Sequence, residues 1–170
     1  PRYCFYSYFC RLMIKTGQQL KALISTPKKI VITTHRGSDG DAMGSSLGLF
    51  HLLKQLGHTV NVITPNEYAS FLHWMPGNNE VIIYEGNEKS ADTITDEADL
   101  IFLLDFSDLR RIAPFTDSVS KSNATKIMID HHQDPDRDIA ELIFSDTKAC
   151  STAQLVYEVM DVMGMTTYLN

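Results

Sequence analysis

Aspartate and histidine residues gather early in the chain, where one predicted element gives way to another. The stretch VITTHRGSDGDAMGSSLG, residues 31–48, places His35, Asp39 and Asp41 within seven residues. An ordinary turn needs only Gly, Asn or Ser, so this choice of residues requires another explanation. Imidazole nitrogens and carboxylate oxygens are both ligands for divalent cations. The stretch therefore suggests metal chemistry as a hypothesis to test against the rest of the sequence.

Two later segments end on the same residue types. The apolar run LIFLLDF leads into Asp105, and KIMIDHH ends with Asp130, His131 and His132. Each residue alone has an ordinary explanation, and Asp41 alone is best explained as a helix N-cap. Together, several carboxylates in one crevice would repel one another unless cations compensated their charge. A divalent metal is the simplest compensation.

Buried strands are the elements that must position these residues. Four near-continuous apolar runs predict strands at 29–35, 59–64, 98–106 and 126–132, and a fifth is predicted at 80–85. Runs that are apolar throughout indicate burial on both faces, which is typical of a parallel sheet. Ligands bind at the carboxyl ends of the strands in such sheets, so we expect the Asp and His residues to converge there.

Helical patterns separate and follow these strands. Apolar residues recur at helical spacing over 43–53, before Gly57, and a second helix is predicted over 151–164, with a Ser/Thr cap candidate at its start. The predicted fold is α/β, with a mostly parallel, Rossmann-like sheet and helices on both faces. We predict one domain over 29–170, preceded by an N-terminal helical segment at 1–28.

Composition narrows the class of protein. The 170 residues are 44% hydrophobic and 21% charged, as in soluble globular proteins, and no run of about 18 apolar residues could cross a bilayer. A net charge of -6 makes long duplex DNA a poor candidate partner. Cys4, Cys10 and Cys150 include no CxxC pair, so we expect a cytoplasmic protein without disulfides or a thiolate zinc site. The oligomeric state stays open, a dimer included.

The donor set favours particular metals. Asp oxygens and His nitrogens without Cys suit Mn²⁺, Mg²⁺, Fe²⁺ or Co²⁺ better than structural zinc. Asp105 comes from a different strand than its neighbours, so it can face His35 and Asp39 on one side and Asp41 and His131 on the other. Such a carboxylate can bridge two ions about 3.5–4 Å apart, as in two-metal hydrolases. We therefore expect two divalent ions, with Mn²⁺ as the first candidate.

Three segments of the chain resemble the motifs of a known family. HRGSDGDAMGSS, LLDFSDLRRI and MIDHH are similar, in this order, to three motifs of the DHH phosphoesterase superfamily. The resemblance covers the chain from Lys29 to its end. The forms GDAMGSSLGL and DFSDLRRI are most similar to the branch called nanoRNases or pAp phosphatases. Ser38 stands where the family often has Pro, which should change the stiffness of the loop but not the ligand set.

The resemblance implies a role for each candidate metal ligand. His35 and Asp39 would bind one metal ion, and Asp41 and His131 would bind the other. Asp105 would bridge the two ions. The ligand set implied by the family therefore agrees with the one expected from the residues alone.

The resemblance also implies roles outside the metal ligands. His132 would contact the scissile phosphate, and Asp130 would orient the histidines. Gly44 and Ser45 lie in the first turns of the predicted helix, where they would either bind a substrate phosphate or serve close packing.

The implied activity is hydrolysis of short oligoribonucleotides, of 3′-phosphoadenosine 5′-phosphate, or of both, by water that two metal ions activate. The alternatives are a manganese inorganic pyrophosphatase, a cyclic-dinucleotide phosphodiesterase, and a nucleotide-binding domain without turnover. The fourth ligand motif of the family and its C-terminal substrate-binding domain are not found before Asn170. We therefore expect a catalytic domain that is incomplete at its C-terminus, and a fragment with little or no activity.

One loop carries aromatic residues. The segment 65–80 frames Phe71, Leu72 and Trp74 with prolines and a glycine. Stacking of aromatic side chains on bases normally accompanies a basic rim, which this segment lacks. We expect these three side chains to cover the edge of the sheet.

Overall fold

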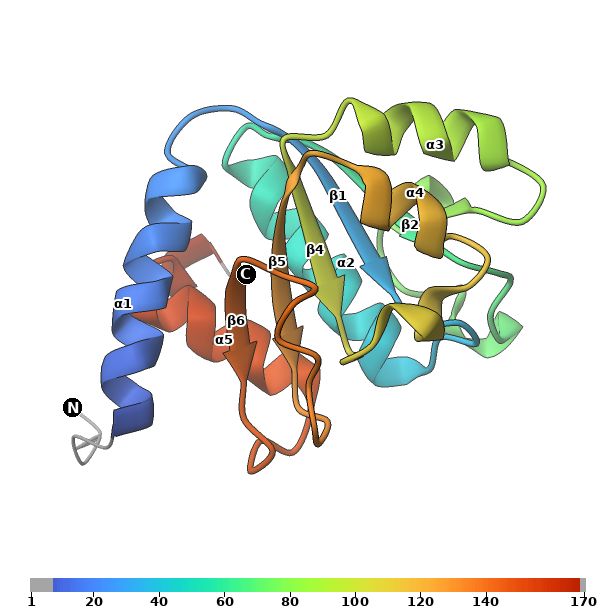
Figure 1. Ribbon diagram of the computed structural model, residues 1–170. Coiled ribbons are helices and arrows are strands. Elements are labelled where there is room, and N and C mark those ends of the chain that lie inside the picture. The colour runs from blue at the N-terminus through green and yellow to red at the C-terminus, as the bar shows by residue number, and fades with distance from the viewer. Residues whose placement is uncertain (1–7, 169–170) are drawn as a thin grey trace.

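A six-stranded parallel sheet forms the centre of the computed structural model, which describes residues 8–168 (Figure 1). The strand order is β3-β2-β1-β4-β5-β6, and every pairing between these strands is parallel. The strands are β1 (Lys29–Thr34), β2 (Thr59–Thr64), β3 (Ile82–Ile83), β4 (Leu100–Leu104), β5 (Thr125–Asp130) and β6 (Leu142–Ser145).

Helices cover both faces of this sheet (Figure 1). One face packs against α1, α2 and α5, and the other against α3 and α4. The predicted α/β fold with helices on both faces is thereby confirmed. The helices are α1 (Tyr8–Leu23), α2 (Gly40–Gln55), α3 (Glu88–Asp96), α4 (Thr116–Lys121) and α5 (Thr152–Val162).

The central strand β4 shows why its sequence is apolar throughout. Leu100, Phe102 and Leu104 point into the core beneath α2 and α5, while Ile101 and Leu103 point into the core beneath α3 and α4. Successive side chains of a strand face opposite sides, and here both sides are buried. The strand therefore has no face on which a polar residue would be solvated.

The order of the strands defines where a ligand would bind. The chain adds strands outward from β1 to β2 and β3, and then returns to place β4 on the other side of β1. Ligands bind outside the carboxyl ends of the strands at such a reversal, because the connecting loops diverge there and leave a crevice. The neighbouring ends of β1, β4 and β5 lie at this edge.

The structure also differs from the expected elements. It adds a short edge strand, β6, and two helices, α3 and α4, that the apolar pattern did not predict. The strand expected at 80–85 is reduced to Ile82–Ile83. Of the expected N-terminal helical segment, α1 is present, and residues 1–7 lie outside the described residues. None of the described helices combines the length and apolar character that a membrane span requires.

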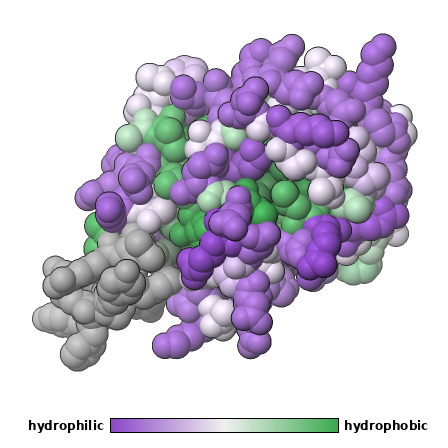
Figure 2. All heavy atoms as spheres, in the orientation of Figure 1, coloured by the Kyte–Doolittle hydropathy of each residue, from purple (hydrophilic) through white to green (hydrophobic). Residues whose placement is uncertain are grey.

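Figure 2 shows the face of the sheet that carries α3 and α4. Hydrophilic residues cover most of this surface, and a strip of hydrophobic residues is visible near its middle. Ala140 and Ile143, near and in the edge strand β6, are only partly buried against the core on this side. The two short helices α3 and α4 therefore cover this face less completely than α1, α2 and α5 cover the other.

The aromatic loop departs from expectation. Leu72 is buried and packs into the core, as expected. Phe71 and Trp74, however, are 73% and 76% exposed, so the expectation that they cover the sheet edge is wrong. A single short 3₁₀ turn, Ser70–Leu72, can direct only part of its surface inward, and Leu72 occupies that part.

Candidate metal centre

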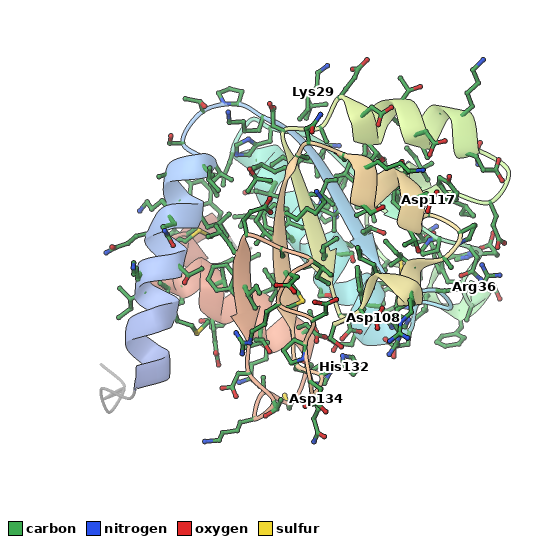
Figure 3. All side chains as sticks on the ribbon, in the orientation of Figure 1. Lys29, Arg36, Asp108, Asp117, His132 and Asp134 are labelled. Carbon is green, nitrogen blue, oxygen red and sulfur yellow. The ribbon has the colours of Figure 1, made fainter. Side chains whose placement is uncertain are left out.

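The predicted site residues meet at the carboxyl edge of the sheet. They come from the loop after β1 and the start of α2, from the end of β4, and from the end of β5. In Figure 3 the labelled side chains of Arg36, Asp108 and His132 lie along this same edge. The residues expected as ligands or as their partners are His35, Asp39, Asp41, Asp105, Asp130, His131 and His132.

Asp105 occupies the middle of this arrangement. Its carboxylate is 2% exposed, although it carries a charge. Its Oδ2 lies 3.5 Å from Nε2 of His35, and its Oδ1 lies 3.6 Å from Nε2 of His131. The backbone has φ 65°, a left-handed conformation that Asp tolerates better than most residues. The two oxygens of one buried carboxylate therefore face two different histidines.

Two clusters of possible ligands share this carboxylate. His35, Asp39 and Asp105 offer ligand atoms that all lie within 4.8 Å of one another, and so do Asp105, His131 and His132. Asp41 lies beside the second cluster, with Oδ2 3.7 Å from Nε2 of His131. A carboxylate shared by two clusters has the placement that a bridging ligand requires.

The histidine rings are oriented for a cation. Nδ1 of His35 lies 2.9 Å from the carbonyl oxygen of Arg36, and Nδ1 of His131 lies 3.3 Å from that of Ala149. Since a carbonyl oxygen only accepts, the Nδ1 atom of each ring donates to it, and Nε2 of each ring faces the carboxylates. Carbonyl partners of this kind fix the tautomer of metal-binding histidines.

The distances agree with this interpretation. The lone pair of an unprotonated Nε2 atom and a carboxylate oxygen repel each other unless a proton or a metal ion lies between them. The separations of 3.5 to 3.7 Å are longer than a good hydrogen bond. Ligand atoms that bind one ion at about 2.0–2.3 Å lie about 3–3.7 Å from each other. The residues present therefore fit divalent metal ions.

The pKa values of His35 and Asp105 also indicate that the site favours positive charge beside the Asp105 carboxylate. The pKa of His35 is raised, chiefly by its contact with the Asp105 carboxylate, although burial opposes this shift. Burial also acts to raise the pKa of Asp105, but the nearby His35 ring and the hydrogen bond from Thr152 outweigh it, so the pKa of Asp105 is lowered. Asp105 thus stays ionised and draws positive charge toward itself.

Asp130 and His132 form a separate pair. The side chain of Asp130 is fully buried, and its Oδ1 accepts a hydrogen bond of 2.7 Å from Nδ1 of His132. Its Oδ2 also accepts a bond of 3.2 Å from the backbone amide of His132. Asp130 therefore holds both the ring of His132, through Nδ1, and its backbone amide. Its contact with phosphate and the orienting role of Asp130 remain predictions.

The start of α2 differs from the sequence interpretation. Asp39, not Asp41, is the N-cap: its Oδ1 accepts hydrogen bonds of 3.0 Å from the amides of Asp41 and Ala42. Asp41 instead accepts from the backbone amides of Thr152 (2.7 Å) and Ala153 (3.0 Å). One aspartate of the first motif thus begins α2, and the other holds the start of α5.

Gly44 and Ser45 follow in α2. The buried hydroxyl of Ser45 donates to the carbonyl oxygen of Ala42 at 3.2 Å, so it already has a partner within the helix. A Cβ atom added at Gly44 would meet nothing within 4 Å, so close packing does not require a glycine there. A phosphate contact at these two residues remains a prediction.

Cavity volume does not identify this centre. A cavity of about 330 Å³ opens beside the start of β5, where Lys126 and Glu141 line it, and another of about 210 Å³ lies near Lys29. Neither contains any of the seven Asp and His residues. The donor atoms, rather than the size of a pocket, identify the site.

The fold is a parallel α/β domain, and its two Asp and His clusters around a shared carboxylate form a candidate centre for divalent metal ions. The family model described as the DHH family, N-terminal domain, matches residues 29–169. The chain belongs to the DHH family.

Two curated relatives show the same similarity. The chain is 30% identical over 143 residues to the bifunctional oligoribonuclease and PAP phosphatase NrnA of Bacillus subtilis, which covers 82% of this chain and 40% of the relative. It is 31% identical over 138 residues to NrnA of Thermus thermophilus, covering 80% and 37%. The chain therefore spans about two fifths of the length of these relatives.

Solved structures share the fold. An exopolyphosphatase-related protein from Bacteroides fragilis matches with a TM-score of 0.89 and 39% identity, covering 92% of this chain and 46% of that one. The exonuclease RecJ bound to manganese matches with a TM-score of 0.56 and 14% identity, covering 93% and 38%. At 14% identity the second similarity concerns the fold alone.

Proposed function

We propose that residues 29–170 form the catalytic domain of a metal-dependent phosphoesterase that hydrolyses short oligoribonucleotides, 3′-phosphoadenosine 5′-phosphate, or both. The observation that carries this proposal is the buried Asp105 carboxylate between two clusters of Asp and His. The similarity to proteins named as oligoribonuclease and PAP phosphatase supports the choice of substrates.

The ligand assignment follows from the contacts. His35, Asp39 and Asp105 would hold one divalent ion, because their ligand atoms form one cluster. Asp41, Asp105 and His131 would hold the other, because Nε2 of His131 faces both carboxylates. When bound, two such ions activate water and neutralise charge on the phosphoryl group.

The remaining residues act on the substrate. His132 is fixed through Nδ1, so its Nε2 can donate a hydrogen bond to a phosphate oxygen when the ring is protonated. Asp130 fixes the orientation of that ring, since its Oδ1 accepts from Nδ1. The chain thus supplies carboxylate charge for cations and a histidine for the anionic substrate.

A direct test measures hydrolysis by the full-length protein. With Mn²⁺ we expect release of mononucleotides from RNA dinucleotides and of phosphate from 3′-phosphoadenosine 5′-phosphate. Chelation by EDTA should abolish both reactions, and added Mn²⁺ should restore them, because the proposed reaction depends on the two ions to activate water.

The same assay separates the alternatives. Preferential hydrolysis of pyrophosphate would identify a pyrophosphatase instead. Preferential hydrolysis of a cyclic dinucleotide would identify a cyclic-dinucleotide phosphodiesterase. Binding of Mn²⁺ and nucleotide without any turnover would make the protein a nucleotide-binding domain and contradict the proposal.

Arg111 gives a further prediction about substrate binding. Its guanidinium is exposed, and its charge opposes the rise in the pKa of His35 that Asp105 causes, so it acts within electrostatic range of the centre. Among the described residues, no carboxylate pairs with it. We expect Arg111→Gln to raise KM about tenfold with a smaller change in kcat, as loss of a hydrogen bond to a charged group implies.

Arg110 is the matched control for this change. Its Nε donates to both carboxylate oxygens of Asp108, at 3.0 and 2.8 Å, so its charge already has a partner. We expect Arg110→Gln to change KM much less. Steady-state kinetics of both variants on the same dinucleotide make the comparison, and equal values of KM would rule out a specific role for Arg111.

A further inference from the structure

Thr152 connects Asp41 and Asp105, the two carboxylates assigned to the second ion. Its side chain is completely buried, and its hydroxyl donates a hydrogen bond of 2.7 Å to Oδ1 of Asp105. Its backbone amide donates another of 2.7 Å to Oδ2 of Asp41. Both bonds join segments that are far apart in the sequence. One residue therefore holds two acidic side chains that belong to different motifs.

The geometry of Thr152 limits the distance between these carboxylates. Its amide nitrogen and hydroxyl oxygen are joined only through Cα and Cβ, so their separation varies little. Ser151 caps α5 through a 3.0 Å bond from the amide of Gln154, which fixes the start of the helix. A threonine side chain is also restricted at χ1, because its β-carbon is branched. The spacing of the two acceptor oxygens is thus set by a rigid element.

We propose that Thr152 is a positioning residue, which fixes the Asp41 and Asp105 carboxylates at the spacing that the second divalent ion requires. This inference rests on the proposed metal centre but adds a residue outside the ligand set. Thr152 acts here through the carboxylates, since its hydroxyl donates to Asp105 and its amide donates to Asp41. It acts by keeping two negative groups close together before the ion arrives.

The energetic reason concerns like charges. Two carboxylates near one site repel each other, and without support they would turn apart. Hydrogen bonds from a fixed hydroxyl and a fixed amide offset this repulsion and reduce the ordering that binding would otherwise require. Loss of the hydroxyl removes the bond to Asp105 and leaves the amide bond to Asp41 in place.

The test compares Thr152→Val with Thr152→Ser in the full-length protein. Valine keeps the shape and removes the hydroxyl, whereas serine keeps the hydroxyl. Titration with Mn²⁺, followed by the electron paramagnetic resonance signal of the free ion, measures both binding steps without any substrate. We expect Thr152→Val to weaken the second step about 10- to 100-fold, as loss of partners that orient ligands does. Thr152→Ser should stay close to the wild type.

Thr95→Val is the matched control. Thr95 is also completely buried, and its hydroxyl donates to the carbonyl oxygen of Ala91 at 2.8 Å within α3, away from the centre. Thermal unfolding of all variants separates stability from metal affinity. A general effect of losing a buried hydroxyl would appear in Thr95→Val as well, and equal losses of Mn²⁺ affinity there would overturn the proposal.

The other outcomes are equally clear. Wild-type affinity in Thr152→Val, or an equal loss in Thr152→Ser, would overturn the positioning role. If Thr152→Val does not fold, Thr152→Ala replaces it as the variant without a hydroxyl, and the same comparison with serine applies. Normal Mn²⁺ binding by the wild type without hydrolysis would contradict the proposed function and leave this inference standing.

Discussion

Asp105→Asn is expected to reduce Mn²⁺-dependent turnover by about 10³-fold or more, equivalent to about 4 kcal/mol of transition-state stabilisation. The change keeps the shape of the side chain and removes the charge that both clusters share. The introduced amide group could also donate to Nε2 of His35 or His131, now 3.5 and 3.6 Å from the carboxylate oxygens. The variant should therefore keep its fold and lose its affinity for both ions.

Asp130→Asn is the control for this prediction. Asp130 contacts His132 and is not placed in either cluster, so its loss should reduce turnover by only about 10- to 100-fold. Turnover of both variants is compared at saturating Mn²⁺, with circular dichroism to verify folding. Equal losses would mean that the ligand and its supporting residue have been confused.

Phe102→Ala is expected to have the largest effect on stability. Phe102 is 1% exposed in the middle of β4, and it fills the core between the sheet, α2 and α5. Truncation of a buried Phe to Ala costs about 3–5 kcal/mol, because a cavity remains where the ring was. For a chain of this size the midpoint of thermal unfolding should fall by about 10 °C.

Phe71→Ala tests the same change of residue on the surface. Phe71 is 73% exposed, so the free energy of unfolding should change by less than about 0.5 kcal/mol. Urea denaturation of the two variants gives the comparison. A large loss in Phe71→Ala would show that the aromatic loop is covered in solution by a contact outside the described residues.

The central strands were the most predictable part of the fold. The strand predicted at 59–64 is β2 itself, and 29–35 exceeds β1 by one residue. Their uninterrupted apolar residues follow directly from burial on both faces. The edge strand β6 has only four residues, three of them partly exposed, so it carries no comparable pattern. Helix α3 is mostly polar and buries only Ala91 and Thr95 in full, which explains why periodicity did not reveal it.

The candidate metal centre could likewise be predicted only where a local sequence pattern indicates it. The strand ends predicted which Asp and His residues meet, because parallel strands share an edge. The role of Thr152 depends on contacts with residues 47 and 111 positions earlier, which no local pattern encodes. The Ser/Thr pair expected at the start of α5 was the available signal, although it indicated only a helix cap. The contacts of Asp41 likewise depend on where α5 packs, since its carboxylate accepts from the amides of Thr152 and Ala153.

The hydrogen bonds between Asp41 and the start of α5 also bear on how the protein is made. They join residues 111 and 112 positions apart. At a synthesis rate of about 5–20 residues per second, roughly 6 to 22 s pass between the translation of these two segments. During that interval the first motif is present without the helix that orients it. The candidate metal centre is therefore complete only after all six strands of the parallel sheet have been translated.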